Sequence, residues 1–280
     1  MNSACYKKHN VMKKIYFLSD VHLGSWAIEH RRTHERRIVS FLDKIKNEAA
    51  AVYLLGDVFD FWYEHRYVVP KGFTRFLGKI SELTDRGVEV HFFTGNHDQW
   101  CLDYLEKECG MTIHREPCLV ELYGNEIFLA HGDEFSRQRG YKVLRALFRG
   151  RLTRWAFSML HPRWSLWMGH KWSQHSMVKH KVKGDTPFLG AEKEDCIVFA
   201  NKYLETHESV DCFIFGHRHI DIDMPLGEKS RCIFLGDWIS TFAYVVLDGK
   251  TIERKYFIEG ESKDLQKTNA TPFDVAFVFL

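Results

Sequence analysis

The sequence predicts an α/β fold with a mainly parallel sheet. Short apolar runs typical of buried strands alternate with longer segments in which apolar residues recur every three or four positions. Several of these runs end in residues that can bind a metal, often directly after a glycine. The chain has 280 residues, 45% of them hydrophobic, which is enough for one large domain or two domains of roughly 150 residues each.

The first part of the chain, up to Asp98, follows this alternation closely. The expected strands are Ile15–Ser19, Ala51–Leu55 and Val88–Thr94, and the expected helices are His34–Asn47 and Phe73–Arg86. Gly87 ends the second helix. Because a helix lies between successive strands, the chain crosses back over the sheet and the strands pair in parallel.

The pattern changes after Asp98. Gly124-Asn125 between two apolar runs predicts a hairpin, followed by a long helical and aromatic stretch from Arg137 to about Met177. The remaining expected elements are the hairpin strands Leu119–Tyr123 and Glu126–Ala130, a helix over Glu192–His207, and strands over Asp211–Phe215, Arg231–Leu235, Phe242–Leu247 and Thr251–Phe257. We therefore expect a core over 13–134 and 185–260, an inserted helical segment over 135–184, and a loosely held tail over 261–280.

Charge is distributed unevenly along the chain. The net charge of +2 does not indicate a globally basic nucleic-acid binder. Segment 135–184 nevertheless contains twelve Lys and Arg and no Asp or Glu, whereas the rest of the chain carries 27 basic and 37 acidic residues. Four of the eight tryptophans, at 155, 164, 167 and 172, lie in this segment. An acidic body with one basic, aromatic block indicates an anionic partner.

The cysteines and the apolar runs predict a cytoplasmic protein. The seven cysteines form no C-x-x-C pair, which is typical of reduced thiols inside the cell. The first residues lack the apolar region of a secretory signal, and no run is long and apolar enough to span a membrane.

Five predicted strand ends carry metal-type ligands. They are Asp20-Val21-His22, Gly56-Asp57-Val58-Phe59-Asp60, Gly95-Asn96-His97-Asp98, His131-Gly132-Asp133 and Gly216-His217-Arg218-His219. The carboxyl ends of strands in an open α/β sheet face one crevice, so these distant residues are expected to meet there. The repeated glycine lets the backbone turn sharply where a ligand must point inward.

Carboxylate, imidazole and amide ligands together suit two divalent cations, with manganese the first expectation and iron, zinc or magnesium the alternatives. In the most economical arrangement, Asp57 bridges the two cations. One cation takes Asp20, His22 and His219, and the other takes Asn96, His131 and His217. Two such cations about 3.5–4 Å apart can clamp a phosphoryl oxygen and activate water, so no nucleophilic side chain is required.

Four further residues of these blocks have other expected roles. His97 is a candidate catalytic residue that stabilises developing charge or protonates the leaving oxygen, and Asp98 could orient it. Asp60 and Asp133 are more typical of residues that hydrogen-bond a loop or cap a helix.

The five ordered blocks resemble those of the calcineurin-like metallophosphoesterases over about residues 13–240. The resemblance implies a four-layered αββα sandwich, a dinuclear metal centre and the same ligand assignment.

A narrower resemblance is to the UDP-2,3-diacylglucosamine pyrophosphohydrolases of lipid A synthesis. It is carried by Leu18–Gly24, by Leu55–Asp60 and by the helical insertion after His131-Gly132-Asp133. The resemblance implies hydrolysis of the pyrophosphate of an acylated nucleotide-sugar, giving UMP and 2,3-diacylglucosamine 1-phosphate. The chain departs from the best-known members at His97, where they carry Arg.

This resemblance favours one interpretation of segment 135–184. We expect a helical cap that takes acyl chains and lies on an anionic membrane surface, at the inner face of the cytoplasmic membrane. Plain packing and nucleic-acid contact are the alternatives, with nucleic acid the weakest. The candidate substrate contacts are Arg137, Arg139, Lys142, Trp155, Lys179 and Lys181.

Two other functions remain open from the sequence. Gly-Asn-His-Asp is typical of general or cyclic-nucleotide phosphodiesterases, although a small substrate needs no apolar cover. A non-catalytic binding scaffold of this fold is expected to lose ligands, and all seven are present here.

Overall fold

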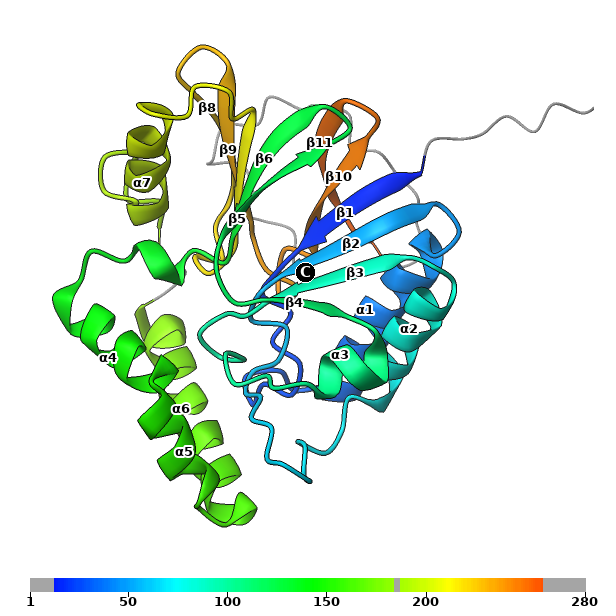
Figure 1. The fold of residues 1–280 in the computed structure, drawn as a ribbon, viewed down its shortest axis with the longest axis vertical. Coiled ribbons are helices and arrows are strands. Elements are labelled where there is room, and N and C mark those ends of the chain that lie inside the picture. Colours follow the sequence, from blue (N-terminus) through cyan, green and yellow to red (C-terminus); the bar gives the residue numbers. More distant parts are fainter. Residues whose placement is uncertain (1–12, 184–186, 259–280) are drawn as a thin grey trace, which may run out of the picture.

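The computed structural model describes residues 13–183 and 187–258, and for 174–183 it describes the backbone alone. The expected tail over 261–280 lies outside the described residues. Within the described part of the chain, two β-sheets lie face to face, with helices on the outer side of each (Figure 1). The four-layered sandwich implied by the resemblance is therefore confirmed.

The first sheet has the strand order β11-β10-β1-β2-β3-β4. Its strands are β1 (Lys14–Leu18), β2 (Ala49–Leu55), β3 (Glu89–Phe93), β4 (Thr112–His114), β10 (Ala243–Asp248) and β11 (Thr251–Tyr256). The helices α1 (Arg31–Ile45), α2 (Thr74–Asp85) and α3 (Tyr104–Cys109) cover its outer face (Figure 1).

The second sheet has the order β5-β6-β7-β9-β8. Its strands are β5 (Cys118–Leu122), β6 (Asn125–Ala130), β7 (Cys212–Phe215), β8 (Asp221–Leu226) and β9 (Ser230–Leu235). Helix α7 (Asp195–Leu204) covers its outer face, and the short 3-10 helix η1 (Asp133–Phe135) follows β6.

Both sheets are mixed, which corrects the expectation of one mainly parallel sheet. Strands β1 to β4 pair in parallel, but β10 and β11 join them antiparallel. In the second sheet β6, β7 and β9 pair in parallel between the antiparallel edge strands β5 and β8. The pattern of single strands does not reveal which strands share a sheet, and only the family resemblance implies two sheets.

Strand β1 shows why the strands are apolar on both faces. Ile15 and Phe17 pack between the sheets, whereas Tyr16 and Leu18 pack under the helices of the first sheet. A strand buried on both faces needs a continuous apolar run rather than alternation.

Three short elements escaped the sequence analysis: α3, β4 and β8. The first two are too short to show periodicity. Strand β8 is an edge strand that contains polar residues and Pro225. An edge strand tolerates proline because one side of the strand has no hydrogen-bonding partner in the sheet.

The expected helical stretch from Arg137 consists of α4 (Arg139–Arg149), α5 (Arg151–Ser158) and α6 (Pro162–Lys183). We call these three helices the helical cap. They lie beside the sandwich rather than within its layers (Figure 1). Phe61, Tyr63 and Trp100 of the core attach them by packing against Phe148, Phe157 and Leu166. Among the helices that the structure describes, none combines the length and the apolar character needed to cross a membrane.

Candidate metal centre

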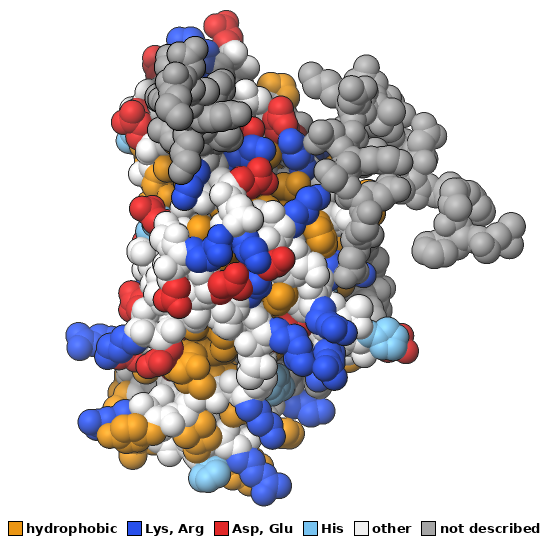
Figure 2. Space-filling model, turned by 90° about the vertical axis from the view of Figure 1, so that its right-hand side faces the viewer, with side chains coloured by type: hydrophobic (Ala, Val, Ile, Leu, Met, Phe, Trp, Pro, Cys, Tyr) orange, Lys and Arg blue, Asp and Glu red, His pale blue; other side chains and the backbone are white. Residues whose placement is uncertain are grey.

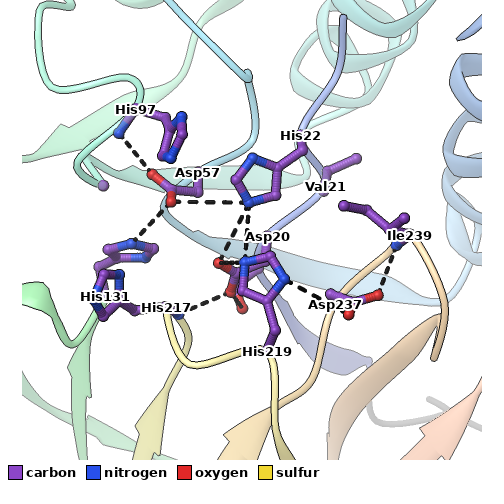
Figure 3. Close-up of polar contacts among 12 residues, drawn as sticks. Asp20, Val21, His22, Asp57, His97, His131, His217, His219, Asp237 and Ile239 are labelled. Atoms are coloured by element: carbon purple, nitrogen blue, oxygen red, sulfur yellow. Dashed lines mark hydrogen bonds and ion pairs between the residues drawn. The ribbon is translucent and has the colours of Figure 1, made fainter. Parts of the chain in front are cut away.

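Six of the seven predicted ligands lie together at the carboxyl ends of β1, β2, β6 and β7 (Figure 3). Several of them adopt a left-handed backbone conformation that ordinary residues avoid. Their φ angles are 53° at Asp20, 49° at His22, 51° at Asp57, 66° at His217 and 53° at His219. Such a conformation costs about 1–3 kcal/mol per residue and is concentrated at functional sites, because it aims a side chain where a regular strand cannot.

Glycines allow the close approach of neighbouring loops. A Cβ atom on Gly95 would lie 2.2 Å from Asp57 Oδ1, and one on Gly216 would lie 2.6 Å from Asp20 Oδ2. From the sequence, these glycines are expected in sharp turns. At Gly95 and Gly216 the requirement is space for a carboxylate, whereas Gly56 also has a positive φ of 86°.

We therefore expect Gly95→Ala to displace the Asp57 carboxylate and to weaken metal binding by about 10–100-fold, the range seen when the support of a ligand is lost. Titration with Mn²⁺ measures this effect. Gly78→Ala is the matched control, because Gly78 lies in α2 with open space around its Cβ position and should gain about 0.5–1 kcal/mol of stability. Equal Mn²⁺ affinity in the two variants would contradict the expectation.

The first group of ligands comprises Asp20, His22 and His219. The His219 Nε2 atom lies 3.3 Å from Asp20 Oδ1, and the His22 Nε2 atom lies 3.8 Å from the same oxygen. The two Nε2 atoms are 3.1 Å apart. The Asp20 carboxylate is fully buried, and its other oxygen accepts a hydrogen bond of 2.9 Å from the backbone N–H of His217.

The second group comprises Asp57, His131 and His217. Asp57 Oδ2 lies 3.3 Å from His131 Nε2 and 3.9 Å from His22 Nε2 of the first group. One carboxylate oxygen thus lies between the two groups, as a bridging ligand requires. Asn96 lies in the adjacent turn, and its side-chain oxygen is buried without a hydrogen-bond partner among the described residues.

Three of the histidines present the same ring atom to the centre. His22, His131 and His219 each turn Nε2 toward a carboxylate, while Nδ1 faces a second acceptor outside the centre. For His131 this acceptor is the carbonyl oxygen of Leu55 at 2.8 Å. For His219 it is Asp237 at 3.7 Å, and for His22 it is Asp60 at 3.7 Å. Such outer partners fix the tautomer and the ring orientation of a metal ligand.

Asp237 was missed by the sequence analysis. Its Oδ1 atom accepts hydrogen bonds from the backbone N–H groups of Ile239 and Ser240, at 2.8 Å and 2.6 Å, which holds it against His219 (Figure 3). A signal was present, because Gly236-Asp237 follows buried strand β9 just as Gly56-Asp57 follows β2.

The carboxylates favour protonated histidines around them. Burial lowers the pKa of His22, but its contacts with Asp20, Asp60 and Asp57 outweigh burial and raise the pKa to about 10. Burial also lowers the pKa of His219, yet Asp20 and Asp237 raise it to about 9. Ligation needs neutral imidazole, so we expect cation binding at this centre to release protons.

Asp57 and His217 show the complementary shifts. Burial raises the pKa of Asp57, but the charges of His131 and His97 outweigh it and hold this carboxyl well below its usual range. Burial and the charge of His131 lower the pKa of His217 to about 4, so His217 is neutral at physiological pH.

The donor set fits divalent cations. Asp20 Oδ1, Asn96 Oδ1 and His131 Nε2 are buried and have no hydrogen-bond partner among the described residues. An unpartnered buried polar atom costs about 1–3 kcal/mol, which a coordinated cation would offset. Ligand clusters for divalent cations are therefore present where the sequence predicts them.

The structure corrects the expected role of Asp98. Its buried carboxylate accepts hydrogen bonds from the backbone N–H groups of Val58 at 2.8 Å, Phe59 at 3.2 Å and Gly95 at 2.8 Å. Asp98 therefore joins two ligand-bearing loops instead of orienting His97. The His97 ring instead contacts the carbonyl oxygen of Asp60 through Nδ1, at 2.8 Å, and its backbone N–H donates to Asp57 Oδ1 at 2.9 Å.

The structure places the expected substrate contacts differently. The guanidinium of Arg137 pairs with Asp195 and the carbonyl oxygen of Lys193 near the start of α7, and its contact with substrate stays a prediction. Arg139, Lys142 and Trp155 are exposed, and their contact with substrate stays a prediction. Lys179 and Lys181 lie in α6 where side chains are outside the described residues.

Some basic side chains of segment 135–184 pair with acidic residues of the core. Arg145 pairs with buried Asp133 at 2.8 Å, and Arg149 lies 3.7 Å from Glu116. Acidic residues outside segment 135–184 thus balance some of its cations, which composition alone does not show.

Comparison with known proteins agrees with this geometry. The sequence model of the calcineurin-like phosphoesterase family matches residues 13–221. The chain belongs to the calcineurin-like phosphoesterases. Members of this family are metal-dependent hydrolases. This activity requires clustered metal ligands, and the chain has the clusters described above.

Several relatives within the calcineurin-like phosphoesterases carry the name UDP-2,3-diacylglucosamine hydrolase. One from Porphyromonas gingivalis is 46% identical over 250 residues, covering 85% of this chain and 95% of that protein. One from Aeromonas salmonicida is 30% identical, covering 82% of this chain and 88% of that protein. One from Pseudomonas aeruginosa is 28% identical, covering 80% of this chain and 90% of that protein.

Proposed function

We propose that this chain hydrolyses the pyrophosphate of UDP-2,3-diacylglucosamine, releasing UMP and 2,3-diacylglucosamine 1-phosphate. The observation that carries the proposal is the 46% identity to a UDP-2,3-diacylglucosamine hydrolase over 95% of that protein's length. The ligand groups around Asp57 and the helical cap support it. In the reaction, one phosphorus gains a hydroxyl from water, and the bridging oxygen departs with the other phosphorus.

The residues of the centre have distinct proposed tasks. Asp20, His22 and His219 would hold one divalent cation, Asn96, His131 and His217 would hold the other, and Asp57 would serve both; manganese is our first expectation. When bound, the two cations supply Lewis-acid polarisation of the phosphoryl oxygens and lower the pKa of coordinated water. His97 supplies a hydrogen bond or a proton to the departing phosphate, with its ring held by the carbonyl oxygen of Asp60.

The exposed apolar surface of the cap supports an acylated substrate. Large hydrophobic side chains are exposed along all three cap helices, among them Leu152 at 75%, Trp155 at 61% and Trp164 at 58%. A phosphodiester without acyl chains gains nothing from such a surface, which argues against a general or cyclic-nucleotide phosphodiesterase.

We expect the purified enzyme with Mn²⁺ to release UMP from UDP-2,3-diacylglucosamine far faster than it cleaves cyclic nucleotides or small phosphodiesters. Product analysis by chromatography measures both activities in parallel. Faster turnover of a non-acylated diester would assign the chain to the alternative phosphodiesterase function. Removal of the cations by a chelator should abolish UMP release, and added Mn²⁺ should restore it.

The same cap supports contact with an anionic membrane surface. Figure 2 shows hydrophobic and basic side chains at the lower end of the molecule, the end at which α5 and α6 lie in Figure 1, while acidic side chains lie higher. Exposed tryptophan together with Lys and Arg is typical of proteins that bind the interface of an anionic bilayer. We propose that the protein acts at the inner face of the cytoplasmic membrane, which these side chains support.

Co-sedimentation with vesicles tests the membrane proposal. We expect binding to phosphatidylglycerol vesicles and weak binding to phosphatidylcholine vesicles. Each Lys or Arg near an anionic surface contributes about 1 kcal/mol, so Arg151→Ala and Arg163→Ala, which remove exposed cations of α5 and α6, should each weaken binding roughly fivefold. Lys229→Ala and Lys250→Ala, in the turns at the opposite end of the sheets, are matched controls that should bind normally. Equal losses in both pairs would contradict the assigned surface.

A further inference from the structure

Cap helix α6 reaches the metal centre through the carboxylate of Asp60. Ser173 of α6 donates a hydrogen bond to Asp60 Oδ2, and both side chains are buried. The other oxygen, Oδ1, lies 3.7 Å from Nδ1 of His22. A single carboxylate therefore lies between a cap helix and a predicted metal ligand.

Helix α6 approaches this carboxylate closely because its inner face carries small residues. Ser165, Gly169 and Ser173 follow one another at intervals of four and are all buried. The Ser165 hydroxyl lies 2.8 Å from His65 Nε2, and a Cβ atom on Gly169 would lie 2.0 Å from the ring of Phe61. Residues at this spacing share one face of a helix, so α6 packs along the segment that begins with Asp60.

The geometry between Asp60 and His22 is that of a carboxylate that orients a metal-binding histidine. His22 turns Nε2 toward Asp20, Asp57 and His219, which leaves Nδ1 for an outer acceptor. His22 Nδ1 and Asp60 Oδ1 are both buried, and neither has a hydrogen-bond partner among the described residues. A small movement would join them, and a carboxylate that accepts the Nδ1 proton fixes the tautomer that ligates through Nε2.

Ser173 fixes the orientation of the Asp60 carboxylate relative to His22. Its hydroxyl donates to Oδ2, and this contact leaves Oδ1 directed toward His22. Without the hydroxyl, a buried charged oxygen loses its donor and the carboxylate can turn toward another partner.

We propose that Asp60 is a positioning residue through which the docking of cap helix α6, by way of Ser173, sets the affinity of the centre for the cation held by His22. The inference rests on the metal centre proposed above and not on the acylated substrate. It links the position of cap helix α6 to the affinity of the centre for a cation through Asp60, whereas α4 lies near the centre separately, with the Tyr141 ring 6.5 Å from the ring of His217.

Titration of the full-length protein with Mn²⁺ alone tests the proposal, with free Mn²⁺ followed by electron paramagnetic resonance. We expect Ser173→Ala to weaken the binding of one Mn²⁺ by about 10–100-fold, as loss of an outer-shell partner does. Ser165→Ala is the matched control, since it removes a buried hydroxyl from the same face of α6 but contacts His65 instead of Asp60. It should bind Mn²⁺ as the wild type does, and Ser173→Thr, which keeps the hydroxyl, should recover most of the affinity.

A second readout separates positioning from general damage to the fold. At limiting Mn²⁺, Ser173→Ala should hydrolyse a small chromogenic phosphodiester more slowly than the wild type, and saturating Mn²⁺ should restore its rate. A purely structural loss would not respond to metal concentration.

Wild-type Mn²⁺ affinity in Ser173→Ala, or an equal loss in Ser165→Ala, would overturn the proposal. If circular dichroism shows that Ser173→Ala is unfolded, Asp60→Asn decides the question, because it keeps the shape of the side chain and removes its charge. Asp60→Asn should also bind one Mn²⁺ about 10–100-fold more weakly, and unchanged affinity would refute the link. If the wild-type protein binds Mn²⁺ normally but releases no UMP, the result contradicts only the proposed substrate and leaves the positioning role of Asp60 intact.

Discussion

Asp57→Ala is expected to abolish phosphoester hydrolysis. The Oδ2 atom of Asp57 lies between His131 Nε2 at 3.3 Å and His22 Nε2 at 3.9 Å, so its loss separates the two ligand groups. A pair of cations contributes several kcal/mol to the transition state, and each 1.36 kcal/mol is a factor of ten, so kcat/KM should fall by at least about 10³-fold. Steady-state kinetics with saturating Mn²⁺ measures the loss, and a metal titration should show the binding of at least one cation impaired.

Asp103→Ala is a suitable control for the Asp57 variant. Asp103 is exposed and pairs with Lys107 on the surface, so its removal should leave both turnover and metal binding unchanged. Circular dichroism would show that Asp57→Ala is folded, and Asp57→Asn provides a variant of the same shape. Normal turnover by a folded, metal-loaded Asp57 variant would exclude the bridging role.

His97→Ala is expected to lower kcat by about 10²–10⁴-fold, the range for loss of a general acid or base, while metal binding is kept. Turnover and metal binding should respond differently because of the contacts that His97 makes. Its backbone N–H, and not its ring, donates to Asp57 Oδ1, so truncation of the ring leaves that ligand supported. Single-turnover kinetics together with Mn²⁺ titration would distinguish the two effects.

His97→Arg separates two roles for the ring. An arginine can donate a charged hydrogen bond to a phosphoryl oxygen, but it does not release a proton near neutral pH because its pKa exceeds about 12. High activity in His97→Arg would indicate electrostatic stabilisation, and activity as low as that of His97→Ala would indicate proton transfer. Wild-type kcat in His97→Ala would show that the ring takes no part in the reaction.

The sequence alone predicted the ligand residues because their signal is local. Each ligand block follows a buried strand, and the ends of strands in this class of fold converge. The same rule could have identified Asp237, which follows Gly236 at the end of β9. Asp237 was nevertheless missed, because its Gly-Asp pair has no second metal-type ligand beside it in the sequence.

The roles of Asp98, Asp60 and Arg137 depend on partners that the local sequence does not reveal. Asp98 binds backbone N–H groups from the loop that carries Asp57, and Arg137 pairs with Asp195 of a distant helix. The two-sheet arrangement is implied only by the family resemblance and not by the local pattern, since strand pairing joins segments such as β1 and β10 that are far apart in the chain. Long-range pairing is decided by packing rather than by local pattern.

Anomalous diffraction at the manganese edge, from crystals grown with saturating Mn²⁺, would test the metal centre most directly. We expect two peaks, one among Asp20, His22 and His219 and one among Asn96, His131 and His217, with the Asp57 carboxylate between them. A single peak, peaks distant from Asp57, or no peak at saturating Mn²⁺ would contradict a dinuclear centre assembled from these strand ends.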